Sequence, residues 1–369
     1  MSSIKQLGFA QFILFMIFFK IILLPFSFLY YLVTTLRNHL FNIGYSHSFK
    51  FDIPVINVGN LRVGGTGKTP HVEYLISLLK DRYKVATLSR GYGRRTQGFI
   101  IADEDSDASL IGDEPMQYYR KFAQDIVVNV CEDRAYAIPQ ILFEREETQV
   151  ILLDDAYQHR TVIPSLNILL SDFKNPFYKD WLLPSGRLRE SRHGASRADV
   201  IIISKCPENL SKSQMKDIKR EVRKYCKEST PVFFTSFKYG QPKAIYDTHI
   251  EPAGNANVLL FSGIADSEVL RKKIDSDYKL TKNIDFSDHH KYSENDIQSI
   301  IRAFNEIKEE NKFILTTEKD MVKLTDKRII EIFSGYPVFY IPVEVYFLYE
   351  EQKFDDLVIR TITDHAAFK

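Results

Sequence analysis

The chain has 369 residues, and its 49 Lys and Arg residues almost balance 48 Asp and Glu residues, which leaves a net charge of +1. This length allows two domains with substantial cores. Because the charge is balanced, no global basic field points to a nucleic-acid partner. Three cysteines without a Cys-x-x-Cys pair argue against a disulfide framework or a zinc site and fit a reducing compartment.

The N-terminal segment is apolar. Residues 9–33 contain few polar side chains, but the uninterrupted part, residues 12–19, is shorter than the roughly 20 helical residues that cross a bilayer. Including Lys20 would place a charge inside the membrane, at a cost of about 2.5–3.5 kcal/mol. A helix in the interface would let this lysine reach the headgroups. We therefore predict a membrane-associated helix within residues 1–45, which either spans the bilayer or enters one leaflet; a buried soluble helix is the alternative.

A glycine-rich segment at residues 59–70 follows the apolar run at residues 53–58. A helix-like run at residues 71–80 comes after the glycine-rich segment. In such a unit, backbone N–H groups point at phosphate oxygens, Lys68 adds a positive charge and the Thr69 hydroxyl can hold Mg²⁺. Arg62 replaces the glycine that usually stands six residues before the lysine. We predict a nucleoside-triphosphate site formed by Gly64, Gly65, Thr66, Gly67, Lys68 and Thr69.

A second nucleotide-site element is the run Val-Ile-Leu-Leu-Asp-Asp at residues 150–155. An apolar strand that ends in carboxylates is the expected form of a Walker-B element, which holds Mg²⁺ directly or through water. The sequence does not choose between Asp154 and Asp155 as the metal ligand. Strands ending in aspartate are common, so this prediction depends on the glycine-rich segment upstream.

Strands and helices alternate along the chain, which predicts an α/β fold with a doubly wound, largely parallel sheet of the P-loop NTPase type. A Gly- and Pro-containing connection at residues 238–257 separates a second, smaller α/β unit. Expected strands lie at residues 53–58, 84–89, 125–130, 149–154, 166–171, 199–204, 231–237 and 258–264. The expected organisation is an N-terminal segment over residues 1–45, a P-loop core over residues 46–253 and a C-terminal domain over residues 254–369.

Two loops carry closely spaced arginines. Residues 90–95 hold three arginines and two glycines after an expected strand, at the sheet edge where α/β proteins bind ligands; a solvated basic turn is the alternative. The long loop at residues 181–196 carries Arg187 and Arg189. Either arginine could reach a phosphoryl group as an arginine finger, or both could face solvent.

Two further groups of polar residues are candidates for proton transfer. Asp113 and Glu114 open an expected helix, where the helix dipole favours acids, so the sequence alone supports only a capping role. His289 and His290 follow Asp288. Adjacent side chains diverge and no third ligand is near, so one histidine as a catalytic partner is a better interpretation than a metal site.

Seven motifs in chain order make the sequence resemble the tetraacyldisaccharide 4′-kinase family of lipid A biosynthesis. The resemblance implies transfer of the ATP γ-phosphoryl group to the 4′-hydroxyl of a tetraacylated glucosamine disaccharide 1-phosphate, which yields lipid IVA. It also implies ATP and Mg²⁺ as cofactors, a membrane surface as partner and the cytoplasmic face of a Gram-negative inner membrane as location. No obligate protein partner is evident. The motifs lie at residues 58–70, 89–94, 112–115, 154–159, 187–190, 288–289 and 315–320.

The resemblance assigns roles to residues that the sequence alone left open. Asp113 becomes a candidate general base paired with His289, and we expect closure of an interdomain cleft to join them. The imidazole could orient Asp113 or accept the proton as a relay. Arg189 and Glu190 would organise the γ-phosphate and Mg²⁺. The candidate catalytic residues are Asp113, His289, Lys68, Arg189 and Glu190, and the candidate metal ligands are Thr69, Asp154, Asp155 and Glu190.

A P-loop GTPase or a metal-delivery ATPase of the deviant P-loop class is the alternative function. Guanine selection usually needs Asn/Thr-Lys-x-Asp, but residues 204–207 lack the Asp and residues 317–320 have the Lys displaced. A metal chaperone would need a Cys or His cluster, and none occurs in the sequence. A nucleotide-binding scaffold without catalysis is a third class, and the intact Lys68 and Thr69 argue against it.

Overall fold

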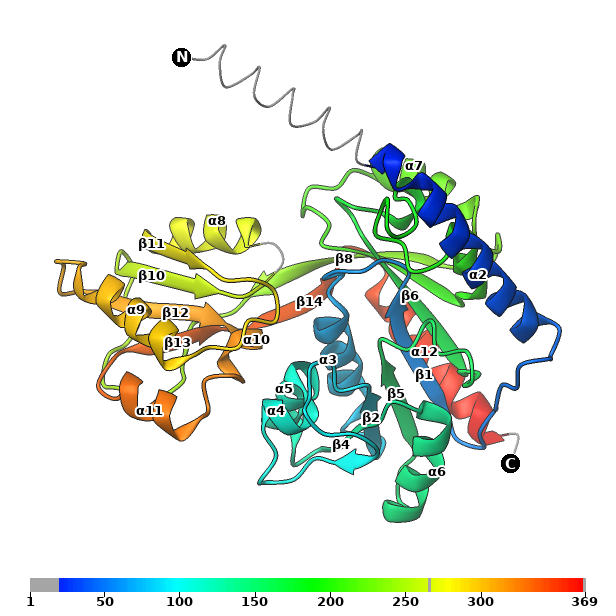
Figure 1. The fold of residues 1–369 in the computed structure, drawn as a ribbon, viewed down its shortest axis with the longest axis horizontal. Helices are drawn as coiled ribbons and strands as arrows, with labels where there is room; N and C mark the ends of the chain where they lie inside the picture. Colours follow the sequence, from blue (N-terminus) through cyan, green and yellow to red (C-terminus); the bar gives the residue numbers. More distant parts are fainter. Residues whose placement is uncertain (1–19, 265–266, 368–369) are drawn as a thin grey trace, which may run out of the picture. The chain divides into compact units, whose positions relative to one another are not determined.

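The structure is a computed structural model that describes residues 20–264 and 267–367. It divides into two compact units, each assembled from separate stretches of the chain (Figure 1). The first unit contains the chain up to residue 68, residues 155–236 and the chain from residue 347; the second contains residues 69–154 and 237–346. The domain boundaries expected near residues 45 and 253 stay predictions.

Four parallel strands form the centre of the first unit, in the order β8-β7-β6-β1. Every residue of β1, β6 and β7 is buried. Continuous apolar runs of this kind are typical of parallel strands that are covered on both faces. The four strands are β1 (Val55–Asn60), β6 (Leu166–Asp172), β7 (Val200–Ser204) and β8 (Val232–Tyr239).

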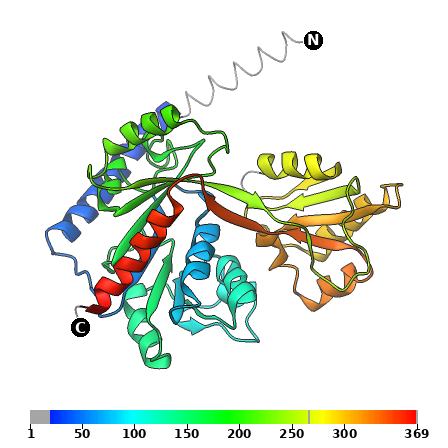
Figure 2. The ribbon, with the colours of Figure 1, turned by 180° about the vertical axis from the view of Figure 1, so that it is seen from behind.

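Among the described residues, three α-helices and two 3₁₀ helices belong to the first unit. In α7, Ser211 and Gln214 form a capping box, which satisfies backbone N–H groups at the helix start. Figure 2 shows α12 (red) along the strands of this unit, and the Phe354 ring packs against Phe233 of β8 with centroids 5.5 Å apart. The helices are α2 (Leu24–Asn42), η1 (Phe177–Lys179), η2 (Arg192–Arg197), α7 (Lys212–Arg223) and α12 (Glu351–Ala367).

Helix α2 covers the later part of the segment for which the sequence predicts membrane association. Pro25 stands in its first turn, where proline is tolerated. Among the described residues, no helix combines the length and apolar character needed to cross a membrane. Residues 1–19, which hold the longest apolar run, lie outside the described part of the chain. Apolar side chains that α2 and the residues before it leave exposed are Ile21, Ile22, Phe26, Phe28, Leu29, Leu32, Val33 and Leu36.

The second unit begins with strands in the order β5-β2-β4-β3, of which the last is antiparallel. The strands are β2 (Val85–Ser89), β3 (Ile100–Ile101), β4 (Ile126–Val130) and β5 (Val150–Asp154). Their helices are α3 (Lys68–Leu79), α4 (Ala108–Ile111), α5 (Asp113–Phe122) and α6 (Arg134–Glu144).

The second unit also contains a five-stranded sheet of order β11-β10-β12-β13-β9. Figure 1 shows α8 on one face and α9 and α11 on the other, and separate apolar clusters fill the two interfaces. The strands are β9 (Lys243–Ala244), β10 (Asn257–Ser262), β11 (Lys279–Asp285), β12 (Lys312–Thr317) and β13 (Val338–Ile341), followed by β14 (Val343–Phe347). The helices are α8 (Glu268–Asp277), α9 (Glu294–Asn305), α10 (Glu318–Met321) and α11 (Lys327–Phe333).

The predicted α/β fold with mostly parallel strands is confirmed. The Walker-B strand was expected at residues 149–154 and is found as β5, and the strand before the glycine-rich segment, expected at residues 53–58, is found as β1. Both candidate motifs therefore stand at the carboxyl ends of parallel strands, which is where α/β proteins bind ligands.

Candidate active site

The glycine-rich segment between β1 and α3 is held by polar groups of the first unit. Asn60 donates from Nδ2 to Thr66 Oγ1 at 2.8 Å, and Ser204 Oγ donates to the Thr66 carbonyl oxygen at 2.8 Å. Gly64 and Gly67 have φ angles of +115° and +82°, in the region that glycine enters without steric cost. The segment therefore forms a fixed loop that could not keep its shape with larger residues at these two positions.

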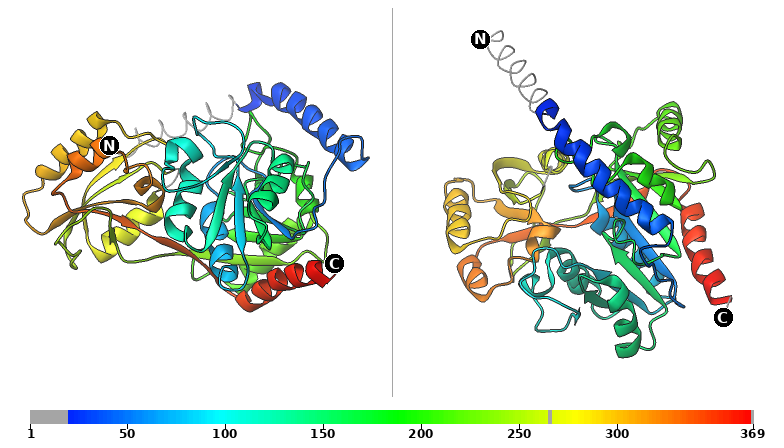
Figure 3. Two further views of the ribbon diagram at one scale, coloured as in Figure 1. Left: turned by 90° about the horizontal axis from the view of Figure 1, so that it is seen from below. Right: turned by 45° about the vertical axis from the view of Figure 1, so that its right-hand side comes forward.

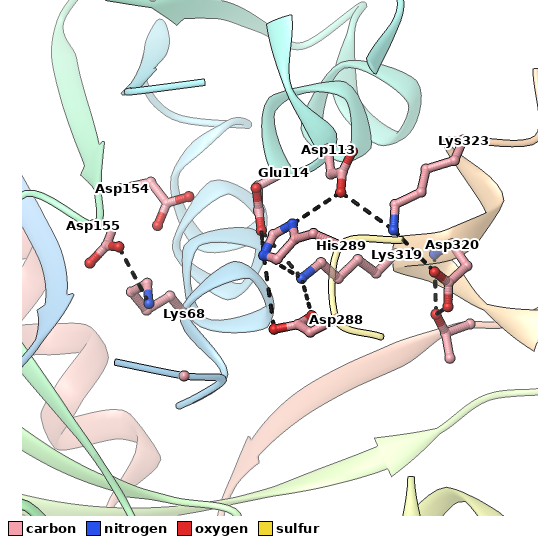
Figure 4. Close-up of polar contacts among 12 residues, drawn as sticks. Lys68, Asp113, Glu114, Asp154, Asp155, Asp288, His289, Lys319, Asp320 and Lys323 are labelled. Carbon is pink, nitrogen blue, oxygen red and sulfur yellow. Dashed lines mark hydrogen bonds and ion pairs between the residues drawn. The ribbon is translucent and has the colours of Figure 1, made fainter. Parts of the chain in front are cut away.

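Lys68, at the start of α3, faces the carboxylate of Asp155 (Figure 4). The Lys68 Nζ lies 3.6 Å from Asp155 Oδ2. Arg189 donates to the same carboxylate from both Nη atoms, at 2.8 and 3.0 Å, and its Nη1 also donates to Gln158 Oε1 at 3.2 Å. Asp155 thus gathers a lysine and an arginine, the two cation types that bind phosphate.

Glu190 is buried, and each of its carboxylate oxygens accepts two hydrogen bonds. Arg197 donates to both oxygens at 2.7 and 2.9 Å, while Gln158 and Asn38 donate one further hydrogen bond each, at 3.1 and 2.8 Å. Burial lowers the pKa of Arg197, but the adjacent Glu190 carboxylate more than offsets this and raises it. The carboxylate expected to bind Mg²⁺ is therefore engaged by a permanently charged guanidinium, and its role as a metal ligand stays a prediction.

Side-chain hydrogen bonds join helix α2, the blue helix in Figure 3, to the loop that carries Arg189 and Glu190. Ser27 Oγ donates to Ser185 Oγ at 2.8 Å, and the Tyr30 hydroxyl donates to the Arg189 carbonyl oxygen at 2.7 Å. These contacts tie helix α2 to the loop of candidate phosphate ligands.

Asp154, the last residue of β5, is buried and accepts a hydrogen bond from Tyr118 of α5 at 2.9 Å. Burial, followed by the charge of Asp154, raises the pKa of Tyr118 well above its ordinary value. The hydroxyl therefore stays protonated and donates to the carboxylate. Thr69 lies in the first turn of α3 in the same unit. In the described part of the chain, no three His, Cys, Asp or Glu residues are grouped so as to hold a metal ion by themselves.

The structure brings Asp113 and His289 together in the second unit (Figure 4). His289 Nδ1 lies 3.2 Å from Asp113 Oδ2, and Lys323 Nζ lies 3.4 Å from the same oxygen. Burial raises the pKa of Asp113, but the hydrogen bond from His289 and the charge of Lys323 outweigh it and lower the pKa. His290 turns away, with Nε2 3.1 Å from Asp296 Oδ2. The contact expected only after cleft closure is already present, and it is made by His289.

A cavity of about 560 Å³ lies beside this pair within the second unit. The Tyr92 ring at its edge lies 5.1 Å, centroid to centroid, from the His289 imidazole. Cations and hydroxyl groups line much of the remaining wall, among them Ser109, Lys291, Tyr292, Ser293 and Arg328. The pair therefore borders a cavity instead of being sealed in a core.

The arginines of the two arginine-rich loops differ in burial and in ion pairing. Arg94 is nearly buried and pairs with Glu132 at 2.5 Å, so its charge is neutralised inside the protein. Arg90 and Arg187 are exposed. Of the expected cationic loop at residues 90–95, at least Arg94 has a structural partner, whereas Arg187 retains the exposure that a phosphate-binding residue would need.

Comparisons with known proteins identify the family of the chain. The family model for tetraacyldisaccharide-1-P 4′-kinase matches residues 19–363. The chain belongs to this family. A tetraacyldisaccharide 4′-kinase of Flavobacterium johnsoniae is 42% identical over 93% of this chain and 97% of that relative, and one of Bacteroides thetaiotaomicron is 38% identical over 93% of both. A crystal structure of LpxK from Aquifex aeolicus in complex with ATP has a TM-score of 0.71 and 30% identity, covering 93% of this chain and 99% of that one.

The family match confirms the resemblance that the motifs indicated, and it makes the chain a kinase. The alternatives of a GTPase, a metal-delivery ATPase or a silent scaffold have no support from these comparisons. The matched range includes both candidate clusters, the Lys68–Asp155–Arg189 group and the Asp113–His289 pair.

Several site residues were not singled out from the sequence. Gln158, Arg197 and Asn38 complete the surroundings of Glu190, and Lys319 and Lys323 lie beside the Asp113–His289 pair. The only signal for the two lysines was their position in and after the motif at residues 315–320, where charged residues directly follow a buried strand. Asp113 and Glu114, which these lysines contact, lie about two hundred residues earlier in the chain, and local patterns cannot show such contacts.

Proposed function

We propose that this kinase transfers the γ-phosphoryl group of ATP to the 4′-hydroxyl of a tetraacylated glucosamine disaccharide 1-phosphate, which yields lipid IVA. The observation that carries the proposal is the contact between Asp113 and His289, 3.2 Å apart, in a chain of this family. Transfer to an alcohol requires that its proton be removed at some stage, and a positioned carboxylate can accept it.

Asp113 is an ionised but weak base in this proposal. Because His289 and Lys323 together lower its pKa, the carboxylate is free of a proton at neutral pH. A weak base suffices because phosphoryl transfer passes through a loose transition state in which positioning and charge neutralisation supply most of the catalysis. The proton of the hydroxyl then moves to Asp113 as the oxygen–phosphorus bond forms.

Lys68 and Arg189 serve the phosphates in this proposal. Both cations contact Asp155 in the structure, at 3.6 Å for Lys68 and 2.8 Å for Arg189. When ATP binds, its phosphate oxygens would compete with Asp155 for these two cations. The fixed loop at residues 64–67 would supply backbone N–H groups to the same phosphates.

Mg²⁺ fits the oxygen donors of this chain. The Thr69 hydroxyl and the Asp154 carboxylate are hard ligands, and a metal that keeps several waters and binds substrate phosphates needs only one or two protein ligands. Asp154 is supported as the metal ligand because Arg189 already hydrogen-bonds the carboxylate of Asp155. A hydrogen bond from Tyr118 holds the Asp154 carboxylate in place. When bound, Mg²⁺ would neutralise charge on the phosphates; positioning of the hydroxyl would remain the work of Asp113 and His289.

We further propose that the enzyme works at the cytoplasmic face of the inner membrane. An acceptor with four acyl chains stays in the bilayer, whereas ATP is available in the cytoplasm. Helix α2 exposes large apolar side chains, including Phe26, Leu29 and Val33, each about 60% exposed. Such side chains favour insertion at the interface of a bilayer. The hydrogen bonds between α2 and the loop of Arg189 support placing the phosphate ligands near this surface.

The experiment that tests the function follows phosphate from labelled ATP into the lipid acceptor with purified enzyme. We expect a product that carries the new phosphate at the 4′-position, and no such product from the Asp113→Asn variant. GTP and a disaccharide without acyl chains serve as comparison substrates, and both should react poorly. Hydrolysis of ATP without phosphorylated lipid, or phosphate at another hydroxyl, would contradict the proposal.

A further inference from the structure

The imidazole of His289 lies between a carboxylate and an ammonium group (Figure 4). Its Nδ1 faces Asp113 Oδ2 at 3.2 Å, and its Nε2 faces Lys319 Nζ at 3.1 Å. Both partners belong to the second unit, on α5 and α10 respectively. Each ring nitrogen therefore has one charged neighbour at hydrogen-bond distance.

The two neighbours require the same arrangement of protons on the ring. An ammonium group only donates, so Nε2 must offer its lone pair, and an ionised carboxylate only accepts, so Nδ1 must carry a hydrogen. We propose that Lys319 is a positioning residue that holds His289 as the neutral Nδ1–H tautomer, so that His289 orients Asp113 while Asp113 alone takes the proton of the acceptor hydroxyl. The catalytic part of this inference rests on the proposed function; the tautomer does not.

The surroundings of Lys319 keep it charged. Asp288 Oδ1 lies 3.1 Å and Glu114 Oε1 lies 3.6 Å from its ammonium group. Burial lowers the pKa of Lys319, but these two carboxylates outweigh the burial and raise it. The ammonium therefore persists at neutral pH as a donor, with hydrogens for both His289 and Asp288.

Two carboxylates near Nε2 oppose this assignment but lie too far away to decide it. Glu114 Oε1 is 3.9 Å and Asp288 Oδ2 is 4.0 Å from Nε2, beyond the range of a hydrogen bond. Lys319 occupies the closer position at 3.1 Å. The same carboxylates contact Lys319 itself, so their charge is already balanced at this side of the ring.

The backbone also fixes the ring. His289 has a φ angle of +59°, in the left-handed region that non-glycine residues seldom adopt and that persists only where the surroundings enforce it. The Tyr92 ring packs against the imidazole, with centroids 5.1 Å apart. His289 is therefore held in one place with one hydrogen-bond partner at each nitrogen.

This arrangement decides between the two roles that the sequence left open for the histidine. A relay would have to receive the proton of Asp113 at Nδ1, which already carries one, while Nε2 is occupied by the hydrogen bond from Lys319. An orienting role uses the Nδ1–H that is present. The structure therefore assigns orientation to His289 and proton acceptance to Asp113.

The direct test is the ¹⁵N NMR spectrum of the ligand-free wild-type enzyme labelled at histidine, with the His289 signals assigned by their loss in His289→Gln. We expect a protonated Nδ1 and an unprotonated Nε2 for His289 at neutral pH. A protonated Nε2, or a ring protonated at both nitrogens, would overturn the proposal. This measurement needs no acceptor, so it can fail or succeed independently of the proposed kinase reaction.

The variant test replaces the donor. Lys319→Met leaves Nε2 facing Glu114 and Asp288, so a proton should appear at Nε2 of His289. The variant should reduce kcat about tenfold, with the KM for ATP changed less than twofold. Lys319→Arg keeps a donor at Nε2 and should retain the Nδ1–H tautomer. Lys272→Met, which removes an exposed ion pair with Glu268, is the matched control and should change neither quantity. An unchanged tautomer in Lys319→Met would overturn the role of Lys319, whatever its effect on kcat.

Discussion

The carboxylates of the candidate site are held by different cations: arginine hydrogen-bonds Asp155 and Glu190 of the first unit, whereas lysine lies beside Asp113 of the second unit. In the first unit, arginines bind with two contacts each: Arg189 on Asp155 at 2.8 and 3.0 Å, and Arg197 on Glu190 at 2.7 and 2.9 Å. A guanidinium is a planar fork that is always charged, so such pairs fix both geometry and charge.

At Asp113, Glu73 and Glu318 of the second unit, the cation is a lysine that makes single contacts. Lys323 lies 3.4 Å from Asp113, and Lys121 lies 2.7 Å from Glu73 and 3.2 Å from Glu318. An ammonium is a compact charge without a fixed direction, so it changes the pKa of its neighbours while constraining their orientation less. The comparison suggests that the arginine-held acids organise the phosphate site and that the lysine-held acids are placed where protons move.

The largest effect is expected for Lys68. Its ammonium group faces Asp155, which is also hydrogen-bonded by Arg189. Lys68→Ala should reduce kcat about a thousandfold or more, because the transferring phosphoryl group loses the positive charge of Lys68 that neutralises its oxygens. Membrane association and folding should be unchanged, which vesicle sedimentation and thermal melting check. Turnover near that of the wild type would remove the glycine-rich loop from the mechanism.

The next largest effect is expected for Asp113, the proposed base, and for its partner His289. Asp113→Ala and His289→Ala should each reduce kcat by at least about a hundredfold, since acid–base groups contribute on that order, with ATP affinity almost unchanged. Because the two residues act as a unit, the double variant should be barely slower than the slower single one. Steady-state kinetics of all three enzymes tests this.

His290 provides the matched control for that pair. His290→Ala should be much milder than His289→Ala, since its ring pairs with Asp296 at 3.1 Å instead of with Asp113. Fully multiplicative losses in the Asp113/His289 double variant would refute the pairing. A larger loss at His290 would show that the wrong histidine had been assigned.

A smaller effect is expected on the exposed face of α2. Serine at Phe26, Leu29 and Val33 should weaken vesicle binding at least about tenfold, because several kcal/mol of apolar burial in the interface would be lost. Ser27, Tyr30 and Asn38 are retained, so the contacts with the loop of Arg189 survive. ATP binding should therefore be unaffected, and use of the lipid acceptor should fall.

The control for α2 lies on a different helix. Tyr136 and Phe143 of α6 are 57% and 77% exposed, and serine at both positions removes a comparable apolar surface. These substitutions should leave vesicle sedimentation unchanged. Equal binding by the α2 variant and the wild type would exclude this face as the membrane contact.

The smallest expected effect is on stability. Burial and the charge of Glu318 raise the pKa of Glu73 from 4.5 to about 7. The protonated Glu73 therefore stabilises the folded state fully below pH 4.5, and this contribution is lost as the pH rises through about 7, by an amount on the order of 1–3 kcal/mol. Glu73→Gln remains neutral, so its melting temperature should fall less than that of the wild type between pH 5 and pH 8.

Glu344→Gln, at an exposed position, is the control for that measurement and should follow the wild type. If the melting temperature of Glu73→Gln fell as much as that of the wild type, the titration of Glu73 would not be the cause of the fall.

Local sequence patterns were sufficient for the parts of the site that depend on strand–turn–helix order. Gly64 to Thr69 follow a buried strand, and Asp154 ends another, so continuous apolar runs located both. Strand β11 was not predicted, because Lys-Leu-Thr-Lys-Asn-Ile-Asp is polar and mostly half-exposed. Helix α12 was also not predicted.

Contacts between distant segments could not be predicted in the same way. Asp113 and His289 are 176 positions apart, and their pairing was expected only from the family resemblance. The pairing of Glu190 with Arg197 was missed, although the two are close in sequence, because a loop without periodicity does not show which way its side chains point. The tertiary fold alone determines these partners.

The central claim is that Asp113, held by lysines, takes the proton, while the arginine-held acids keep the phosphate site in shape. The most direct test is the pH dependence of kcat in the wild type, Lys323→Met and Arg197→Lys. Removing Lys323 should let burial raise the pKa of Asp113, so activity should be lost at a higher pH than in the wild type. Arg197→Lys should leave the acid limb, the fall of kcat at low pH, at the same pH as in the wild type. An unmoved limb in Lys323→Met, or a moved one in Arg197→Lys, would contradict the account. The charged and titratable groups that act on Asp113 in this measurement are His289, Lys323, Lys319 and Tyr292.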